Sequence, residues 1–342
     1  MAVKIRHGDV ETDREVVVGL LARYVNPAYD RARYDWLYHA NPAGRGRLWL
    51  AVDGATGDAI GTAGALPRWV SAGRRDLRAW VLADFCIGEG HRTLGPALQL
   101  QRACIEDLGA DGATLWYDFP SRTMEAVYRR LGAAPRLRIT RSARLLRSYG
   151  LLQKRLGSAA LAWPLSVAVD LALAWGARAP RSITVRPHEG PCGPEFTELA
   201  RGASPGYGAV VRRHADYLNW RYLDNPVRRH EILVARREGR LVGYAVVDAR
   251  GDTAAVVDLF GIPDVRVIEG VLRGALSCLR RRGTASVTLW LSPPGSWVPM
   301  LHRLGFRPRE TAPVMIESAA PAGATELLDP ALWLLSHGDR DS

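Results

Sequence analysis

Residues 84–97 read D-F-C-I-G-E-G-H-R-T-L-G-P-A and join an apolar run to a stretch typical of a helix. The apolar run W-V-L-A-D-F-C-I, residues 80–87, is typical of a strand, and Pro96 favours the first turn of a helix. The first N–H groups of a helix have no partners within it, so a strand–turn–helix junction attracts anions. Arg92 adds a guanidinium, and Gly95 permits close approach to the backbone. The junction therefore predicts a site for a pyrophosphate-bearing ligand.

The spacing of this junction differs from two widespread phosphate loops. The pattern G-x-x-x-x-G-K-[ST] is absent, and Gly88, Gly90 and Gly95 do not have the G-x-G-x-x-G spacing of dinucleotide-binding folds. The pattern that is present is R-x-x-G-x-A, over Arg92–Ala97.

The composition is that of a globular protein with a basic surface. The chain has 342 residues, enough for two domains, and a formal net charge of +11 that favours anionic partners. Its four cysteines are scattered, which predicts reduced thiols and neither a zinc site nor a disulfide framework. The first twenty residues are too polar for a signal peptide, so we expect a cytoplasmic protein. The cysteine spacing leads us to expect no bound metal.

The sequence repeats itself in order. Residues 36–42 and 220–226 both read W-x-Y-x-x-N-P, and each copy is followed by a strand, a glycine-containing turn and a strand. Further on, V-Y-R-R-L-G-A-A-P-R (127–136) corresponds to M-L-H-R-L-G-F-R-P-R (300–309). The repeat predicts two copies of one α/β domain.

The expected division follows from this repeat and from one apolar segment. We expect a first domain over 1–145, a helical linker over 146–182, a second domain over 183–320 and a tail over 321–342. Within the linker, residues 158–177 are strongly apolar, which favours a helix packed between the domains; peripheral membrane contact is the alternative. Pro164 and Asp170 argue against a membrane span.

With these motifs in place, the chain resembles the GNAT superfamily, the Gcn5-related N-acetyltransferases. The family's acyl-CoA loop, Q/R-x-x-G-x-G/A, directly follows its fourth strand, as R-x-x-G-x-A follows the strand over 80–87 here. A-V-Y-R-R-L-G-A, residues 126–133, is similar to a tyrosine-containing segment of the family. The resemblance implies two tandem GNAT-like domains, each a mixed, mostly antiparallel sheet flanked by helices, joined by the apolar helical linker.

The resemblance also implies how a donor, acetyl-CoA or another acyl-CoA, is bound. The backbone of the strand would pair with the pantetheine arm, and the loop would hold the pyrophosphate. The residues implied for these two roles are, in order, Phe85, Cys86, Ile87, Arg92, Thr93, Leu94, Gly95, Pro96 and Ala97.

Candidate catalytic groups lie close to the junction. Tyr128 occupies the position where the family places the acid that protonates the leaving thiolate, and a phenol keeps its proton near neutral pH. Asp84 and Asp118 are the carboxylates that the topology brings within reach of an acceptor amine, with Glu89 as a third. Cys86 is expected to be a core thiol, so acyl transfer would be direct. Together they predict an N-acyltransferase that acts without a metal.

The second copy departs from the pattern. Its junction, D-L-F-G-I-P-D-V-R-V-I-E-G over 258–270, lacks R-x-x-G-x-A, and Leu301 stands where Tyr128 stands in the first copy. We therefore expect the second copy to build part of the acceptor cleft, lined by Trp220, Arg221 and Tyr222. The competing interpretation of the W-x-Y-x-x-N-P motif is structural, as aromatic anchors on a helix that ends at Asn-Pro.

Two other functions remain open from the sequence. Paired GNAT-like domains also occur in the FemABX group, which transfers amino acids from aminoacyl-tRNA, and a basic chain would suit tRNA. The second is a non-catalytic module that senses an acyl-CoA. In the favoured interpretation the acceptor is a small-molecule amine, such as an amino sugar, and nucleic acid is not a partner.

Overall fold

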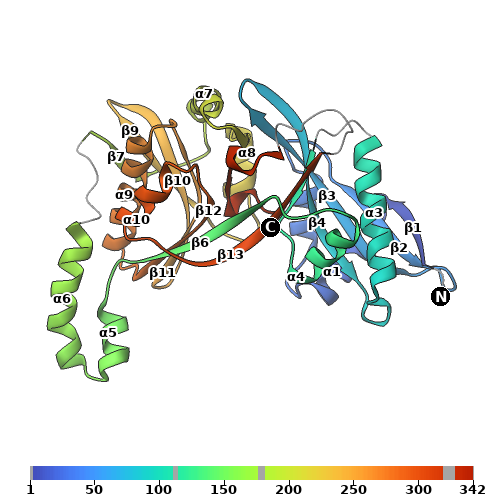
Figure 1. Cartoon of the computed structure of the whole chain (residues 1–342), viewed down its shortest axis with the longest axis horizontal. Coiled ribbons are helices and arrows are strands. Elements are labelled where there is room, and N and C mark those ends of the chain that lie inside the picture. Colours follow the sequence, from blue (N-terminus) through green and yellow to red (C-terminus); the bar gives the residue numbers. More distant parts are fainter. Residues whose placement is uncertain (1–2, 111–114, 176–181, 319–327, 342) are drawn as a thin grey trace.

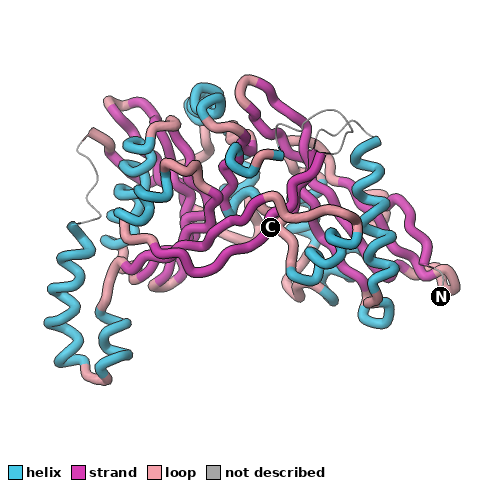
Figure 2. The backbone as a smooth tube through the Cα atoms, viewed as in Figure 1, coloured by secondary structure: helices cyan, strands magenta, loops and turns pink. Residues whose placement is uncertain are grey.

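The computed structural model describes residues 3–110, 115–175, 182–318 and 328–341, and shows an α/β fold with two halves (Figures 1 and 2). The first half contains β1 (Val3–Gly8), α1 (Arg14–Tyr24), α2 (Arg31–Tyr38), β2 (Arg47–Asp53), β3 (Ala59–Ala72), β4 (Arg75–Ile87), α3 (Leu94–Ala110), β5 (Leu115–Asp118), α4 (Arg122–Arg130) and β6 (Leu137–Leu145). Two helices, α5 (Tyr149–Leu156) and α6 (Ala159–Trp175), connect it to the second half.

The second half repeats this order with local changes. It contains β7 (Thr184–Pro187), α7 (Pro194–Ala203), β8 (Ala209–Val211), α8 (Ala215–Leu218), β9 (Glu231–Arg237), β10 (Arg240–Arg250), β11 (Thr253–Gly261), α9 (Val265–Arg281), β12 (Ser286–Ser292), α10 (Trp297–Arg303), β13 (Arg307–Ser318) and β14 (Trp333–Ser336). The halves therefore have the helix and strand order that the sequence repeat predicts.

One continuous sheet runs through both halves, in the order β1-β2-β3-β4-β5-β13-β6-β12-β11-β10-β9-β7. Along this order only β4–β5 and β11–β12 are parallel pairs. The halves exchange strands: β6 of the first half pairs with β12, and β13 of the second half pairs with β5. β6 and β13 also pair with each other at the centre. A domain boundary at residue 145 does not describe this exchange of strands.

Helices cover both faces of the first half of the sheet (Figure 1). Because strand side chains alternate between faces, Leu48 and Leu50 of β2 pack with α1 and α2, whereas Trp49 and Ala51 pack with α3 and α4. The core on the α1 and α2 side continues through the second half, whereas the core on the α3 side includes only Met315 of β13 from that half. The two faces thus provide a rigid frame around β4 and β5.

The two W-x-Y-x-x-N-P motifs meet between the halves. The Trp36 indole N–H donates to the Trp220 carbonyl at 2.7 Å, and the Trp220 indole N–H donates to the Trp36 carbonyl at 2.8 Å. The two rings stack with their centroids 5.1 Å apart. This reciprocal contact explains why both copies keep the motif, since each tryptophan satisfies a backbone group of the other half.

The C-terminal residues form structure where we expected a tail. β14 pairs with β12 and with β8, and β8 pairs in turn with β3 of the first half. The fully buried Asp339 forms an ion pair at 2.9 Å with Arg213, which also pairs with Asp258 at 3.0 Å. Residues 328–341 therefore join the two halves, while 319–327 of the expected tail lie outside the described residues.

The linker helices do not pack between the halves, which corrects the expectation for residues 158–177. α5 and α6 form a hairpin that projects from one end of the molecule (Figure 1). Leu161, Trp163 and Leu171 of α6 are 63%, 66% and 67% exposed. Within the part of the chain that the structure describes, no helix has the length and apolar character needed to cross a membrane.

Candidate functional site

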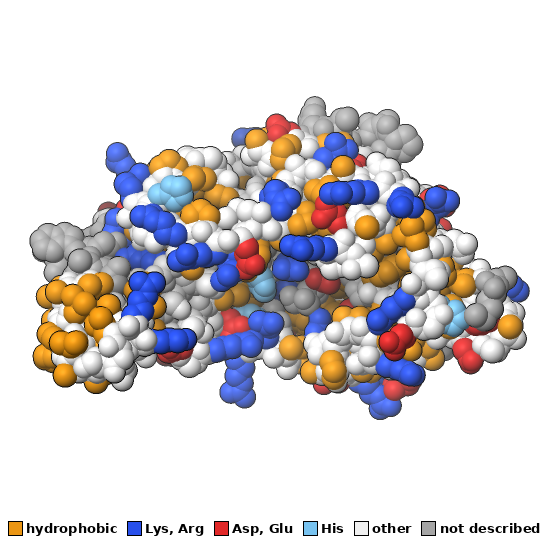
Figure 3. Space-filling model, turned by 60° about the horizontal axis from the view of Figure 1, so that its bottom comes forward, with side chains coloured by type: hydrophobic (Ala, Val, Ile, Leu, Met, Phe, Trp, Pro, Cys, Tyr) orange, Lys and Arg blue, Asp and Glu red, His pale blue; other side chains and the backbone are white. Residues whose placement is uncertain are grey.

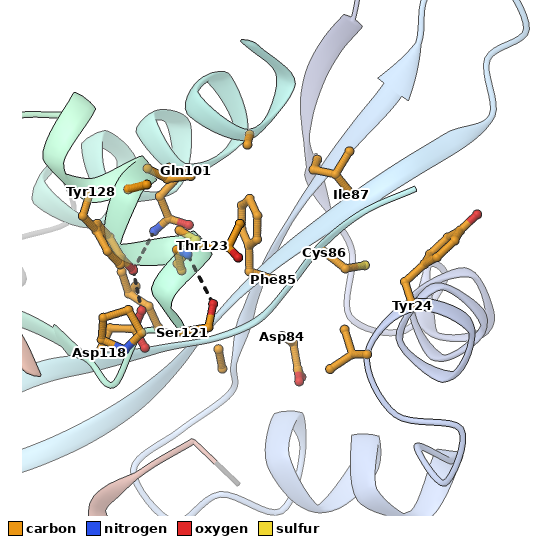
Figure 4. A pocket seen from close by; sticks show the side chains of 18 of the residues that line it. Tyr24, Asp84, Phe85, Cys86, Ile87, Gln101, Asp118, Ser121, Thr123 and Tyr128 are labelled. Carbon is orange, nitrogen blue, oxygen red and sulfur yellow. Dashed lines mark hydrogen bonds between the residues drawn. The ribbon is translucent and has the colours of Figure 1, made fainter. Parts of the chain in front are cut away.

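A cavity opens where β4 and β5 separate. Among the described residues the two parallel strands pair from Ala79/Leu115 to Val81/Tyr117, although β4 continues to Ile87. Beyond the last pair the edge of β4 faces a cavity of about 590 Å³, within the range of ligand sites. The end of α1, the start of α3, and α4 contribute its other walls (Figure 4).

Most residues predicted to bind the donor line this cavity. Phe85, Cys86, Ile87, Arg92, Thr93, Leu94 and Ala97 are among its lining residues, whereas Gly95 and Pro96 are not. A Cβ built at Gly95 would meet no protein atom within 4 Å, so the glycine leaves open space at the first turn of α3. The strand edge and the helix start thus lie together, as the junction predicts.

Arg92 lies between the two parts of this arrangement. Its Nε donates to the carbonyl oxygen of Ile87 at 3.1 Å, and its guanidinium lies 5.5 Å from the ring centre of Tyr24. The side chain is otherwise exposed, so its remaining N–H groups can reach an anion at the start of α3.

Asp84 lies on a β-bulge that directs its side chain into the cavity. The β3–β4 register shifts between Thr62 and Gly64, and Asp84 has φ of 52°, a left-handed conformation that is costly for a residue with a side chain. Its Oδ2 accepts hydrogen bonds from the hydroxyls of Tyr29 at 2.7 Å and Tyr38 at 2.9 Å. Such strain at a cavity wall is typical of a functional position.

Removal from water raises the pKa of Asp84 to about 6, although the hydroxyls of Tyr29 and Tyr38 lower it. The approach of Tyr38 depends on Gly64, because a Cβ there would lie 2.1 Å from the Tyr38 hydroxyl. A carboxylate with a pKa near 6 is largely ionised at neutral pH yet basic enough to accept a proton from an amine. Asp84 is therefore equipped to act as a base.

Asp118 and Tyr128 form a second polar group in the cavity (Figure 4). The Tyr128 hydroxyl donates to Asp118 Oδ2 at 2.7 Å and accepts from the Gln101 amide at 3.4 Å. Tyr128 is fully buried and stacks on Trp116, with ring centres 5.5 Å apart. Burial raises the pKa of Asp118 to about 7, and burial beside Asp118 raises the pKa of Tyr128 well above its ordinary value. The Tyr128 hydroxyl therefore stays protonated near neutral pH and can donate its proton to a stronger base.

Several lining residues were not predicted from sequence. Tyr24, Arg33 and Gln101 lie at helix positions outside the recognised motifs, and Asp341 comes from the far end of the chain. The charge of Asp341 adds to the rise in pKa of both Asp84 and Asp118. Of these residues only Gln101 could have been indicated by sequence, through the amphipathic spacing of α3.

The remaining candidate residues of the junction are not positioned or ionised for a catalytic role. Glu89 and His91 lie on a short turn after β4 and do not line the cavity. The Cys86 thiol lines it, but burial raises its pKa to about 12, so it is not a thiolate near neutral pH. These placements favour direct transfer over an acyl-cysteine intermediate.

The structure does not place Trp220, Arg221 and Tyr222 at the cavity, which corrects their expected role in an acceptor cleft. All three are buried, at 4%, 3% and 2% exposure, and none is a lining residue. The Arg221 Nε donates to the carbonyl of Gly338 at 2.8 Å. They pack the contact between the halves, so we do not retain them as substrate-binding residues.

The equivalent junction of the second half is closed. Asp258 corresponds to Asp84 in the sequence repeat. It is fully buried, pairs with Arg213 and does not line the cavity. At the start of α9, the Asp264 side chain accepts from the Arg266 N–H at 2.8 Å, so a carboxylate already occupies that helix end. No group of His, Cys, Asp and Glu side chains that could hold a metal occurs among the described residues of either half.

Comparison with known proteins supports the fold. No protein-family model matches the chain, and no curated protein matches its sequence. The GCN5-related N-acetyltransferase of Anabaena variabilis matches with a TM-score of 0.68 and 12% identity, over 93% of this chain and 73% of that one. A GCN5-related N-acetyltransferase of Kribbella flavida matches with a TM-score of 0.63 and 16% identity, over 93% of this chain and 72% of that one. Eis1 of Mycobacterium abscessus matches with a TM-score of 0.59 and 13% identity, over 93% of this chain and 74% of that one. The chain therefore has the fold of the GCN5-related N-acetyltransferases.

Proposed function

We propose that this protein is an acyl-CoA-dependent N-acyltransferase that moves an acyl group, acetyl in the first instance, directly from CoA to a small-molecule amine. One observation supports this most: the separated edge of β4, the start of α3 and the carboxylates Asp84 and Asp118 all line the same cavity. We take an amino sugar as the first acceptor to test.

The donor would lie along β4. The edge of β4 over Phe85–Ile87 that faces away from β3 offers hydrogen bonds to the amides of the pantetheine arm, in the manner of an added strand. The N–H groups at the start of α3 and the guanidinium of Arg92 suit the pyrophosphate. This arrangement directs the thioester toward the Asp84 and Tyr128 end of the cavity.

The acyl transfer assigns one group to each proton. The neutral amine attacks the thioester carbonyl, a C–N bond forms, and Asp84 accepts the proton that the nitrogen loses. The C–S bond then breaks, and the leaving thiolate takes the proton of the Tyr128 hydroxyl. Asp118, hydrogen-bonded to that hydroxyl at 2.7 Å, can return a proton to Tyr128 because its pKa near 7 leaves it partly protonated.

Calorimetric titration with acetyl-CoA tests donor binding. We expect saturable binding by the intact protein and its loss in an Arg92→Ala, Gly95→Asp variant, because the new carboxylate would repel the pyrophosphate. Since Gly95 faces open space, the variant keeps the fold, and Arg309→Ala, an exposed arginine outside the cavity, serves as the control.

Thiol release with a panel of amines then tests the reaction. Turnover with an amine supports the transferase, whereas binding without turnover for any amine would favour the sensing module. Absence of binding by every acyl-CoA, together with salt-sensitive binding of aminoacyl-tRNA, would favour the FemABX-like alternative.

A further inference from the structure

The α5–α6 hairpin gathers large apolar side chains at the surface. More than half of the large apolar residues that the described chain leaves exposed belong to it. They are Tyr149, Leu151, Leu156, Leu161, Trp163, Leu165, Val167 and Leu171. The hairpin lies at the opposite end of the molecule from α3 and the cavity (Figure 1), so this surface is separate from the proposed catalytic site.

The exposed side chains of α6 extend around most of the helix. Ala162 and Ser166, four residues apart, are the buried positions that face α5 among the residues up to Leu171. At about 100° per residue, Leu161, Trp163, Leu165, Val167 and Leu171 spread over roughly 200° of the helix surface. A single partner helix covers a stripe of about 100°. A fluid apolar phase covers the wider arc without leaving side chains in water.

The charge of the hairpin is positive. Arg147, Lys154 and Arg155 are exposed, and the one acidic residue between Arg147 and Leu171 is Asp170. Its Oδ1 accepts from the backbone N–H of Ser148 at 2.7 Å and from the Ser148 hydroxyl at 2.8 Å. Asp170 thus serves to hold α5 to α6. In Figure 3 the apolar patch at one end of the molecule is bordered by Lys and Arg side chains.

We propose that the α5–α6 hairpin docks the protein on an anionic lipid surface. Exposed leucines, an exposed tryptophan and neighbouring cations are features of a segment that lies in the headgroup region. α6 would lie along the interface with Trp163 and Leu171 in the acyl boundary, and Lys154 and Arg155 would contact the anionic headgroups. The hairpin would rest on one leaflet.

Flotation with lipid vesicles tests the proposal on the full-length protein. Vesicles of phosphatidylcholine alone are compared with vesicles that contain phosphatidylglycerol in addition, at low and high salt. We expect binding to the anionic vesicles, weaker binding at high salt, and little binding to the neutral vesicles. Lys154→Gln with Arg155→Gln should lower the partition coefficient by about fivefold for each lost cation. Trp163→Gln with Leu171→Gln should lower it by at least about tenfold.

Matched variants control for charge and for apolar exposure elsewhere. Arg229→Gln with Arg309→Gln removes two exposed cations outside the hairpin, and Val16→Gln with Val298→Gln removes two exposed apolar side chains. Both controls should bind the anionic vesicles as the intact protein does. Because all eight altered side chains are exposed, each variant is expected to fold.

Three results would overturn the proposal. They are no binding to anionic vesicles, equal binding to neutral and anionic vesicles, and control variants that lose binding as the hairpin variants do. If the protein instead forms a dimer by sedimentation equilibrium that Trp163→Gln with Leu171→Gln abolishes, without vesicle binding, a second copy covers the hairpin. Acetyl-CoA binding should be unchanged in the hairpin variants, which keeps this test independent of the proposed reaction.

Discussion

The two tyrosine hydroxyls on Asp84 should set its proton affinity. Tyr29→Phe removes the 2.7 Å hydrogen bond while the buried ring keeps its packing, since Tyr29 is only 3% exposed. Hydrogen bonds to charged groups contribute about 1.5–3 kcal/mol, and one pKa unit corresponds to about 1.4 kcal/mol. Because the lost bond stabilised the ionised carboxylate, the pKa of Asp84 should rise by about one to two units from its value near 6.

The titration can be followed by NMR of protein labelled with ¹³C at the aspartate carboxyl groups, and it needs no substrate. The resonance that disappears in Asp84→Asn identifies the group. Tyr34→Phe is the matched control, because Tyr34 stacks on Tyr38 but donates its hydroxyl to the Val10 carbonyl at 2.8 Å. We expect the Asp84 pKa to stay near 6 in this control.

A wild-type Asp84 that titrates near its ordinary value of 3.8 would refute the assignment of a raised pKa. A Tyr29→Phe variant with an unchanged or lowered Asp84 pKa would refute the role of the hydroxyl. If both results agree with expectation, the acidic limb of the acyl-transfer pH profile should move upward by the same amount, since only ionised Asp84 accepts the amine proton.

Three other substitutions have distinct expected outcomes. Tyr128→Phe should lower kcat at least about 100-fold. The affinity for acetyl-CoA, measured by calorimetry, should change by less than about twofold. A large loss of affinity would contradict a role of Tyr128 as the acid. Asp84→Asn should raise the free energy of unfolding by up to about 3 kcal/mol at pH 8, because the pKa of Asp84 rises from 3.8 to about 6 on folding and one unit corresponds to about 1.4 kcal/mol. Ionisation of Asp84 destabilises the fold as pH rises through 3.8 to 6, so urea denaturation at pH 3 should show no such difference. Trp220→Ala should destabilise the protein by about 3–5 kcal/mol in urea. Its folded fraction should bind acetyl-CoA and turn over normally, whereas normal binding with lowered turnover would indicate an acceptor-site residue.

Local signals predicted the junction between β4 and α3 well. The apolar run, the turn and Pro96 follow one another in the chain, so no distant contact is needed to form them. The approach of Asp118 and Tyr128 was also predictable, because a strand and the helix that follows it fix both positions. Tyr29 and Tyr38 reach Asp84, and Asp341 reaches the cavity, only through tertiary packing, which no local pattern reveals, although Tyr38 belongs to the W-x-Y-x-x-N-P motif.

Two expectations differed from the structure for related physical reasons. The sequence offered two interpretations of the aromatic motif around Trp220, a cleft lining and a structural anchor, and the structural one is correct. Its hydrogen bonds run to the other half, which no pattern within one copy can indicate. The apolar segment over 158–177 was expected to be buried, since a helix apolar on all sides usually is. Hydrophobicity predicts that such a helix leaves water, but not whether protein or another phase receives it.

The exchange of β6 and β13 has a consequence for synthesis on the ribosome. Asp118 pairs in register with Met315, so the strand beside a proposed catalytic carboxylate is translated long after it. Until β13 emerges, β5 presents an open edge, which is prone to mispairing with other chains. Contacts so distant along the chain fold slowly. A nascent chain that stops before residue 307 therefore lacks both the strand that pairs with β5 beside Asp118 and the cavity-lining Asp341.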